Sequence, residues 1–342
     1  MKIMVTGGTG FVGAHSVRAL VEAGHQVRLL VRSPDKIEKI LKPMGLDAPP
    51  YVVGDITDAA TVALAMDGCD ATLHCAAVVA LDRRSAARVL ELNPLGAQIV
   101  LGAAVERGLD PIVHVSSVSA LFRPGLSQLT SDLPPTTWGH GYGLSKARAE
   151  EIARRLQDEG APVSITYPAS VAGPAAGALL GENADVIATQ VKSGLIPSAG
   201  SWSVIDVRDL ARVHCALMEP GRGPHRYMCG GHLLTMPAMA QVYRELTGRR
   251  FPVVPAPAAA FHALGAAMDG IMRVAPIHSL ISAEGMAILT GWAPTDDRAV
   301  AKDLGIVWRD SRETFGDALR ALYEAGRLSA KQVGLIATGR EP

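Results

Sequence analysis

The sequence has little that would suit a nucleic acid or a metal as its partner. Lys and Arg together number 33 and so do Asp and Glu, which gives a formal net charge of zero, whereas nucleic-acid binding favours a basic excess. The four cysteines lie at positions 69, 75, 215 and 229 and form no C-x-x-C pair. No metal site is therefore expected, and the cysteines fit reduced thiols in a cytoplasmic protein.

Long apolar runs are also missing. Met1–Val5 is apolar, but it leads directly into glycines, so a signal peptide is not expected. The most apolar later stretch, within residues 255–272, is interrupted by His262, Gly265 and Asp269. It is too short for an integral membrane helix, which needs about 20 apolar residues. The sequence leaves open whether this stretch touches a membrane surface or packs in a core.

Short apolar runs alternate with helix-like segments through the first half of the chain. Continuous apolar strands separated by helices predict a parallel sheet covered on both faces, which is a doubly wound Rossmann domain of the α/β class. The predicted strands are Lys2–Thr6, Gln26–Val31, Tyr51–Val53, Ala71–His74, Ile112–Ser116 and Val163–Tyr167. The predicted helices are Phe11–Ala23, Ala59–Met66, Ser85–Arg107 and Tyr142–Gln157.

The pattern changes after Gly173-Pro174, where strand signals become rare. We expect residues 203–232 to return to the main sheet, with a last strand at Arg226–Cys229. The Rossmann domain is then 1–175 with 203–232, a smaller, mainly helical domain is 176–202 with 233–328, and 329–342 is a loose tail. Helices of the smaller domain are predicted at Leu234–Gly248, Ala256–Met272, Ser279–Thr290, Asp297–Gly305 and Thr314–Ala325.

A glycine-rich loop, Thr6-Gly7-Gly8-Thr9-Gly10-Phe11-Val12-Gly13, joins the first strand to the first helix. Gly7 permits a sharp turn, Gly10 allows the backbone to approach a pyrophosphate, and Gly13 allows tight helix–strand packing. The helix N-terminus adds free N–H groups for the phosphates. The loop therefore predicts a dinucleotide site. Its predicted contacts are Gly7, Thr9, Gly10, Phe11, Val12 and Gly13.

The end of the second strand bears on which dinucleotide binds. NAD-binding domains usually have Asp or Glu at this point, to accept a hydrogen bond from the ribose 2′-hydroxyl. Here the strand ends in Val31-Arg32-Ser33, with Lys36 nearby. Because a guanidinium suits a 2′-phosphate, Arg32 favours NADP(H) over NAD(H). The alternative is a solvated arginine that tolerates either cofactor.

Tyr142 and Lys146 are four residues apart and share one face of a predicted helix. An ordinary tyrosine, with a pKa near 10, is a poor base at neutral pH, and a nearby ammonium lowers that pKa. We therefore expect Lys146 to lower the pKa of Tyr142, so that Tyr142 exchanges a proton with a substrate oxygen. Lys146 can also reach the ribose of the cofactor. Taken alone, this spacing is common on solvated helices.

A hydroxyl group completes the predicted site. Ser117 follows a buried strand at the carboxyl edge of the sheet, where ligands bind in open α/β folds. Its hydroxyl can orient the substrate oxygen and stabilise developing charge. Ser116 is the alternative, since adjacent side chains on a strand point to opposite faces.

Together these motifs resemble the extended short-chain dehydrogenase/reductase family, over nearly the whole chain to about residue 325. The other matching segments are Gly54-Asp55, His74-Cys75-Ala76-Ala77, Asn93 with Gly96, Gly173-Pro174, and Trp292-Ala293-Pro294-Thr295 with Asp297. The resemblance implies that Asp55 and Ile56 lie near the adenine and Ala76 near the ribose. It also implies that residues 168–171 flank the nicotinamide. Further cofactor contacts expected from it are Ala77, Tyr167, Pro168 and Val171.

Departures from the family pattern narrow the expected activity. Val118-Ser119 replaces the Asp-Glu pair of sugar-nucleotide dehydratases, so dehydration is not expected. The segment from Tyr167 to Pro174 is similar to dihydroflavonol reductases and 3β-hydroxysteroid dehydrogenases. We therefore expect an NADP(H)-dependent ketone or aldehyde reductase, or secondary-alcohol dehydrogenase, acting on an apolar small molecule.

Two other functions stay open at this point. One is an NAD-dependent sugar-nucleotide epimerase, and the other is a non-catalytic NADP-binding redox sensor. In many family members the helices that correspond to Ser85–Arg107 and Tyr142–Gln157 form dimers. The resemblance therefore also implies a homodimer.

Overall fold

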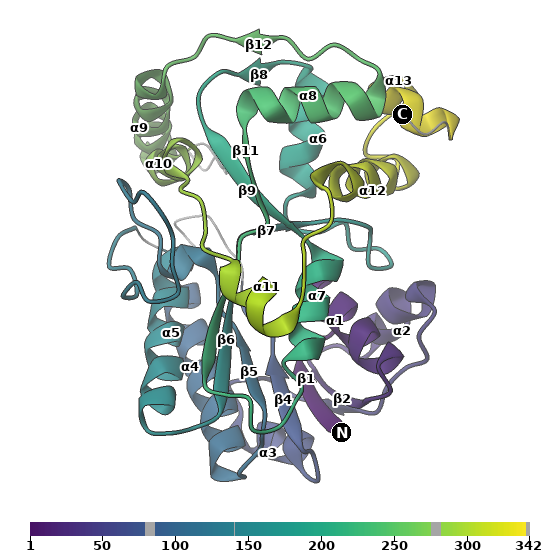
Figure 1. The fold of residues 1–342 in the computed structure, drawn as a ribbon, viewed down its shortest axis with the longest axis vertical. Helices are drawn as coiled ribbons and strands as arrows, with labels where there is room; N and C mark the ends of the chain where they lie inside the picture. The colour runs from purple at the N-terminus through teal and green to yellow at the C-terminus, as the bar shows by residue number, and fades with distance from the viewer. Residues whose placement is uncertain (79–85, 140, 275–281, 340–342) are drawn as a thin grey trace.

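The computed structural model describes residues 1–78, 86–139, 141–274 and 282–339. Its centre is a seven-stranded sheet in the order β10-β6-β5-β4-β1-β2-β3, with every neighbouring pair parallel (Figure 1). This confirms the predicted doubly wound α/β fold. The strands are β1 (Lys2–Thr6), β2 (Gln26–Val31), β3 (Tyr51–Val53), β4 (Ala71–His74), β5 (Ile112–Val115), β6 (Val163–Pro168) and β10 (His225–Cys229).

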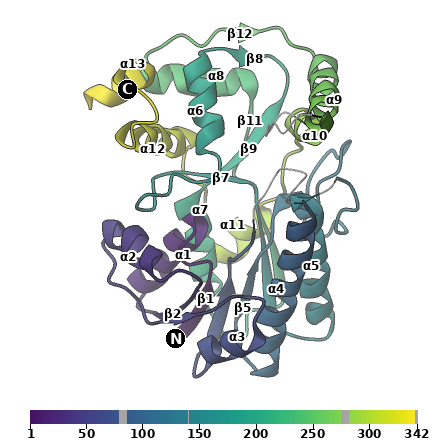
Figure 2. The same cartoon turned by 180° about the vertical axis from the view of Figure 1, so that it is seen from behind.

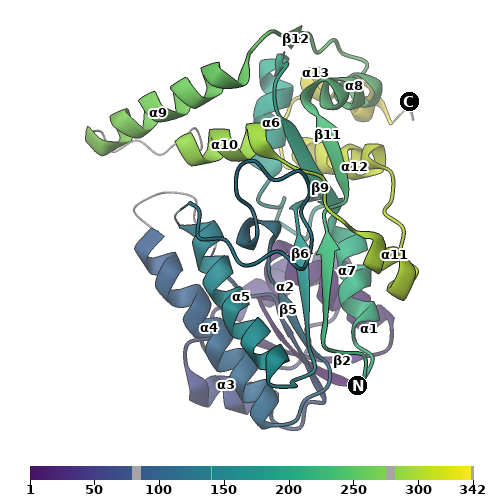
Figure 3. The ribbon, with the colours of Figure 1, turned by 60° about the vertical axis from the view of Figure 1, so that its left-hand side comes forward.

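Helices cover both faces of this sheet, which is why β4 and β5 are buried along their whole length and read as continuous apolar runs. Figure 3 shows α3, α4 and α5 on one face and α1, α7 and α11 on the other, and Figure 2 shows α2 next to α1. The first group is α3 (Ala59–Met66), α4 (Ala86–Glu106) and α5 (Tyr142–Asp158). The second is α1 (Phe11–Glu22), α2 (Asp35–Leu41), α7 (Val207–Ala216) and α11 (Arg298–Leu304).

A smaller unit lies beyond the carboxyl ends of the main strands (Figure 1). It contains a mixed sheet in the order β11-β9-β7 and a two-stranded pair, β12-β8. Its strands are β7 (Ser170–Ala172), β8 (Ile196–Pro197), β9 (Ser201–Asp206), β11 (His232–Thr235) and β12 (Val253–Val254). Its helices are α6 (Ala184–Ser193), α8 (Met236–Thr247), α9 (Ala258–Val274), α10 (Ala283–Gly291), α12 (Ser311–Glu324) and α13 (Ala330–Val333).

The smaller unit has its own apolar core, built around the buried side chains of Trp202, Met239, Tyr243 and Phe315. Several of its helices begin at a side-chain cap, as with Thr235, whose hydroxyl accepts a hydrogen bond from the Ala238 amide in α8. The cores on the two faces of the main sheet are separate from this one. The molecule therefore consists of two units with separate apolar cores. They are connected through β7, β9 and the segments next to these strands.

Three predictions about the second half are wrong. The strand near residue 203, β9, pairs with β7 and β11 and not with the main sheet, because only β10 adds to the edge of β6. Helix α11 packs against the main sheet, since Val300 is buried in that core. The predicted loose tail is held as far as residue 339, because Val333 is fully buried among α6, α8 and α12.

Other predicted bounds agree within a few residues. Helix α4 runs through Pro94 without a break in its assignment. Its predicted start, Ser85, and the predicted helix start at Ser279 lie outside the described residues. Residues 255–272 form the connection to α9 and most of that helix.

Candidate active site

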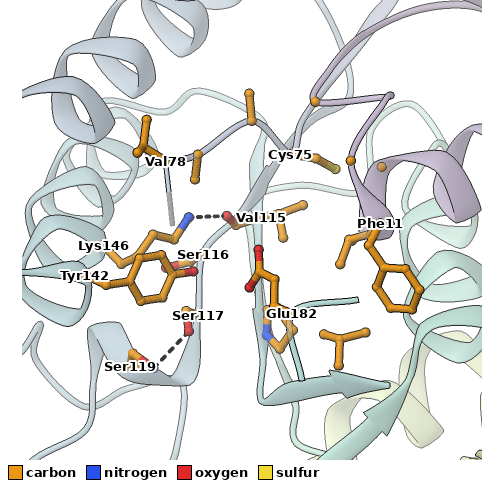
Figure 4. Close-up of a pocket in the computed structure, with 18 of the residues that line it drawn as sticks. Phe11, Cys75, Val78, Val115, Ser116, Ser117, Ser119, Tyr142, Lys146 and Glu182 are labelled. Carbon is orange, nitrogen blue, oxygen red and sulfur yellow. Dashed lines mark hydrogen bonds between the residues drawn. The ribbon is translucent and has the colours of Figure 1, made fainter. Parts of the chain in front are cut away.

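A cavity of about 1070 Å³ opens at the carboxyl ends of the main strands, where they face the smaller unit (Figure 4). Its walls come from the glycine loop, from the ends of β2 to β6, from the starts of α5 and α6, and from the end of α10. Every predicted site residue except Tyr167 lines it. These residues are Gly7, Thr9, Gly10, Phe11, Val12, Gly13, Arg32, Asp55, Ile56, Ala76, Ala77, Ser117, Tyr142, Lys146, Pro168 and Val171.

The glycine loop is shaped as a dinucleotide requires. Gly7 has φ +72°, and a Cβ atom there would lie 2.7 Å from the backbone nitrogen of Ala76. A Cβ on Gly13 would lie 2.0 Å from the Gly7 carbonyl oxygen, so only glycine allows the loop to close on α1. Helix α1 has Gly10 at its N-cap and no side-chain cap. Its first N–H groups are therefore available to a phosphate, and the loop fits the cofactor that the family implies.

The cavity wall at the ends of β2 and β3 carries both an acidic side chain and basic side chains. The Asp55 carboxylate accepts hydrogen bonds from the amide and hydroxyl of Thr57, at 3.0 and 2.8 Å. Burial acts to raise the pKa of Asp55, but these bonds and the charges of Arg32 and Arg88 together lower it. Arg32 is exposed at the end of β2, with Lys36 also in the wall. This end of the cavity therefore offers an acceptor for a ribose and cations for a phosphate.

Lys146 is almost completely buried, with 4% of its surface exposed, one turn into α5. Its Nζ donates a hydrogen bond to the Val115 carbonyl oxygen at 2.7 Å (Figure 4). Burial lowers the pKa of Lys146 to about 8, although the charges of Glu150 and Glu182 act to raise it. The ammonium is thus held at the end of β5, close to the middle of the cavity.

Tyr142 is the first residue of α5, and its ring points into the same space as Lys146 (Figure 4). The expectation that Lys146 lowers the pKa of Tyr142 is wrong for this structure. Burial raises the pKa of Tyr142, the charge of Glu182 raises it further, and only a hydrogen bond with Ser117 lowers it. The reason is that Lys146 is turned to the backbone of β5. Tyr142 is therefore a protonated phenol here.

Both candidate serines border the cavity. The Ser117 hydroxyl accepts a hydrogen bond from the Ser119 amide at 3.1 Å and also bonds to Tyr142. The Ser116 hydroxyl is buried and has no hydrogen-bond partner among the described residues. The structure therefore brings Ser117 and Tyr142 together, with Ser116 beside them.

Tyr167 was expected to contact the cofactor, but its side chain does not reach the cavity. It is fully buried, and its hydroxyl donates a short hydrogen bond to Glu150 and lies 3.1 Å from Arg154 Nη2. Glu150 and Arg154 are one and two turns beyond Lys146 on α5. Because side chains alternate between the two faces of β6, Tyr167 points under α5 while Pro168, the next residue, borders the cavity. The network fixes the position of α5 against β6.

Two functional features were missed in the sequence. Asn93 on α4 bonds to both backbone groups of Val78 and donates to the Ser145 hydroxyl at 3.0 Å, so it ties the chain after β4 to the helix of Tyr142. Asn93 was noted only as part of a family pattern. Glu182, just before α6, places its carboxyl group in the middle of the cavity (Figure 4). No sequence signal marks it, because it lies in an irregular segment.

The comparisons with known proteins agree with this geometry. The sequence model of the NAD dependent epimerase/dehydratase family matches residues 3–230. The chain belongs to this family. That confirms the resemblance to extended short-chain dehydrogenases/reductases.

Members of the epimerase/dehydratase family resemble this chain over almost its full length. Sterol demethylase protein B of Methylococcus capsulatus is 26% identical over 334 residues, which are 96% of this chain and 100% of that protein. A 4-hydroxy-2-methyl-3-oxo-4-farnesyl-3,4-dihydroquinoline-1-oxide ketoreductase of Stigmatella aurantiaca is 28% identical over 333 residues, covering 96% of this chain and 98% of that one.

Among solved structures, a UDP-glucose 4-epimerase of Stenotrophomonas maltophila with bound NAD has a TM-score of 0.75. It is 20% identical, and the match covers 96% of this chain and 100% of that one, so it shows the shared fold. Relatives in the epimerase/dehydratase family include both reductases and epimerases. The chain is thus an enzyme of a family whose members include oxidoreductases and epimerases. This family binds a nicotinamide dinucleotide.

Among the described residues, no group of three His, Cys, Asp or Glu side chains is placed to hold a metal ion. All four cysteines are free thiols. No helix in the described ranges has the length and apolar character needed to cross a bilayer.

Proposed function

We propose that this enzyme is an NADP(H)-dependent oxidoreductase that interconverts a ketone or aldehyde with an alcohol on a largely apolar small molecule. The observation that carries the proposal is the meeting of Tyr142, Ser117 and Lys146 in the cavity that the glycine loop borders. These are the groups that carbonyl reduction needs: a proton donor, a second hydroxyl for the oxygen, and a cation.

The roles follow from the geometry. Bound NADPH supplies the hydride. In reduction, the protonated Tyr142 phenol donates its proton to the carbonyl oxygen, and the raised pKa of Tyr142 keeps that proton in place until it is needed. Ser117 holds the same oxygen through a hydrogen bond. Lys146, already fixed on Val115, provides positive charge beside the developing alkoxide and reaches the ribose.

The preference for NADP(H) is supported by the wall beyond the glycine loop. Arg32 and Lys36 both border the cavity and are both exposed, and Arg32 has no hydrogen bond or ion pair among the described residues. A 2′-phosphate would pair with two free cations, whereas a neutral diol would leave them unused.

The distribution of charge also separates a reductase from a sugar-nucleotide epimerase. The cations among the described lining residues are Arg32, Lys36, Arg88 and Lys146. Arg32 and Arg88 act on Asp55 at the end of the cavity next to β2 and β3. The wall also contains Glu182 and the apolar Val118, Ile288 and Trp292. Beyond Arg32, Lys36 and Arg88, the described lining residues offer a second nucleotide diphosphate only Lys146, so the epimerase is the weaker candidate.

A non-catalytic redox sensor is weaker still, because it would have no use for the paired Tyr142 and Lys146. We further propose a cytoplasmic homodimer that pairs through α4 and α5. The support is that these two helices pack closely on each other at one outer face of the main sheet (Figure 3).

The experiment is a comparison of NADPH and NADH oxidation, followed by absorbance, with a panel of apolar ketones and aldehydes. The proposal predicts turnover that prefers NADPH. Co-purification of tightly bound NAD with epimerisation of a UDP-sugar and no ketone reduction would contradict it. Size-exclusion chromatography with light scattering tests the dimer in the same preparation.

A further inference from the structure

Glu182 lies between β7 and α6, and its side chain is exposed to the cavity. Figure 4 shows its carboxyl group in the space between the Tyr142 ring and Phe11, below the line that joins Lys146 to Val115. Its charge acts on both Tyr142 and Lys146, so it is close to the groups that handle the reacting oxygen. It thus borders the space beside Tyr142 in which the proposed substrate would bind.

The carboxylate has no protein partner among the described residues, in hydrogen bonding or in ion pairing. Two other carboxylates of the cavity wall do have protein partners. Asp185, three residues further on, pairs with Arg327, and Asp55 accepts two bonds from Thr57. The cavity walls also desolvate Glu182 enough to raise its pKa, despite the opposing charge of Lys146. An acid that is partly removed from water and lacks a partner is costly unless something binds to it.

We propose that Glu182 forms a subsite that binds a hydrogen-bond donor of the substrate, a hydroxyl or an ammonium group next to the reacting carbonyl. The proposal rests on the function proposed above only in placing the carbonyl at Tyr142. An ionised carboxylate accepts hydrogen bonds and donates none, so it selects O–H and N–H groups. It also repels an anion at the same place.

The surrounding wall defines the rest of the ligand. Val118, Ile288 and Trp292 line the same cavity and offer apolar surface. Of the cations among the described lining residues, Lys146 is the one whose charge acts on Glu182, and its Nζ is already bonded to Val115. The substrate class is therefore an apolar carbonyl compound with one donor group close to the carbonyl, and neither a carboxylate nor a phosphate.

Four ketones on one scaffold test this directly: acetophenone, 2-hydroxyacetophenone, 2-aminoacetophenone and benzoylformate. They carry respectively no added donor, a hydroxyl, an ammonium and a carboxylate. In the second and third of these ketones the substituent is on the methyl carbon next to the carbonyl and not on the ring. Binding to the protein saturated with NADP⁺ is measured by calorimetry, because the oxidised cofactor cannot reduce a ketone. The wild type is expected to bind 2-hydroxyacetophenone about tenfold more tightly than acetophenone, as a charge-assisted hydrogen bond allows. Benzoylformate should bind most weakly.

The Glu182→Gln variant should bring the affinities for these ligands within about threefold of one another while its affinity for NADP⁺ is retained. The unchanged NADP⁺ affinity shows that the variant is folded. Glu91→Gln is the matched control, because Glu91 lines the same cavity from α4 and the substitution changes the net charge equally. It should leave the order of the four affinities unchanged. Comparison of the hydroxyl and ammonium ligands shows which donor the subsite prefers.

Three results would overturn the subsite: equal wild-type affinity for all four ketones, no measurable binding of any of them, or an unchanged order in Glu182→Gln. Turnover with NADPH is measured separately. If the donor-bearing ketones bind in a Glu182-dependent way but none is reduced, the reductase proposal fails and the subsite stands. If all are reduced without discrimination, the subsite fails and the reductase stands.

Discussion

Lys146 Nζ is bonded to the carbonyl oxygen of Val115 at 2.7 Å, so the last residue of β5 fixes the position of the cation on α5. The sheet and the helix are thereby joined at the point where the reaction is proposed to occur. The same contact explains why Lys146 leaves the phenol of Tyr142 protonated instead of making it acidic. In the proposed reaction, the positive charge of Lys146 then stabilises the substrate oxygen, and its ammonium group binds the cofactor ribose.

The activity should depend on the charge of Lys146. Burial lowers the pKa of this lysine to about 8, so it is charged below that pH and neutral above it. We predict that kcat/KM for ketone reduction is level below about pH 8 and falls about tenfold for each further pH unit. A Lys146→Arg variant keeps its charge throughout, so its profile should lose this fall even if its activity is lower. An identical fall in that variant would assign the titration to another group.

The choice of cofactor should depend on Arg32. Replacing it with serine removes a cation that would pair with the 2′-phosphate, and we predict a 10- to 100-fold loss in kcat/KM for NADPH with little change for NADH. Arg107→Ser is the control, because Arg107 lies at the far end of α4 and bonds to the Ala103 carbonyl. Equal losses with both cofactors in Arg32→Ser would show that Arg32 does not recognise the phosphate.

Acid should destabilise the fold through buried neutral histidines. Burial lowers the pKa of His15 to about 4 and those of His74 and His214 to about 3, from 6.5. As the pH falls, these histidines are therefore protonated in the unfolded chain before they are protonated in the folded protein. As far as these histidines determine it, the free energy of unfolding is highest above pH 6.5. Each histidine lowers it by about 1.4 kcal/mol per pH unit as the pH falls from 6.5 toward 4 for His15 and toward 3 for His74 and His214.

His214 allows this to be measured, since its ring lies 2.8 Å from the Ser16 hydroxyl and 3.3 Å from that of Thr166. In His214→Asn the free energy of unfolding from denaturant titration should fall less steeply between pH 6.5 and 4.5 than in the wild type. A parallel dependence in the two proteins would mean that His214 does not contribute to it.

The network beneath α5 should contribute more to stability than surface ion pairs do. Glu150 is fully buried between Arg154 and Tyr167, so Glu150→Gln leaves a largely buried guanidinium without its counter-ion. We predict a loss of about 3–5 kcal/mol in the free energy of unfolding. The exposed pair of Arg155 and Glu159, on the same helix, is the control, and Glu159→Gln should change stability by less than about 1 kcal/mol. Equal effects would contradict the assigned role of the network.

Much of the fold was predictable because its signals are local. The glycine loop and the apolar runs of β1, β4, β5 and β6 lie within short segments, and the continuous apolar residues of these strands indicate burial on both faces. The sheet to which β9 belongs was not predictable, because its partners come from residues 170–172 and 232–235. Likewise, the tail is held by contacts of Val333 with distant helices, and no local pattern reports them.

The site divides in the same way. Tyr142 and Lys146 could be identified because any helix keeps residues four apart on one face. The direction in which the pKa of Tyr142 shifts could not be predicted, because it depends on the burial of Tyr142 and on the hydrogen bond of Lys146 to Val115. Tyr167 was misplaced because a family position was taken as a side-chain contact, whereas the alternation of β6 turns that ring toward Glu150. Glu182 reaches the cavity through an irregular segment whose path depends on the packing of α6.

The most direct test of the account is the Tyr142→Phe variant, assayed with NADPH and a reducible ketone and titrated with NADP⁺. The ring is kept and only the proton donor is removed, so kcat should fall by at least about 10²-fold while the affinity for NADP⁺ changes by less than about threefold. A variant that binds the cofactor normally and retains near wild-type kcat would contradict the assignment of Tyr142 as the proton donor.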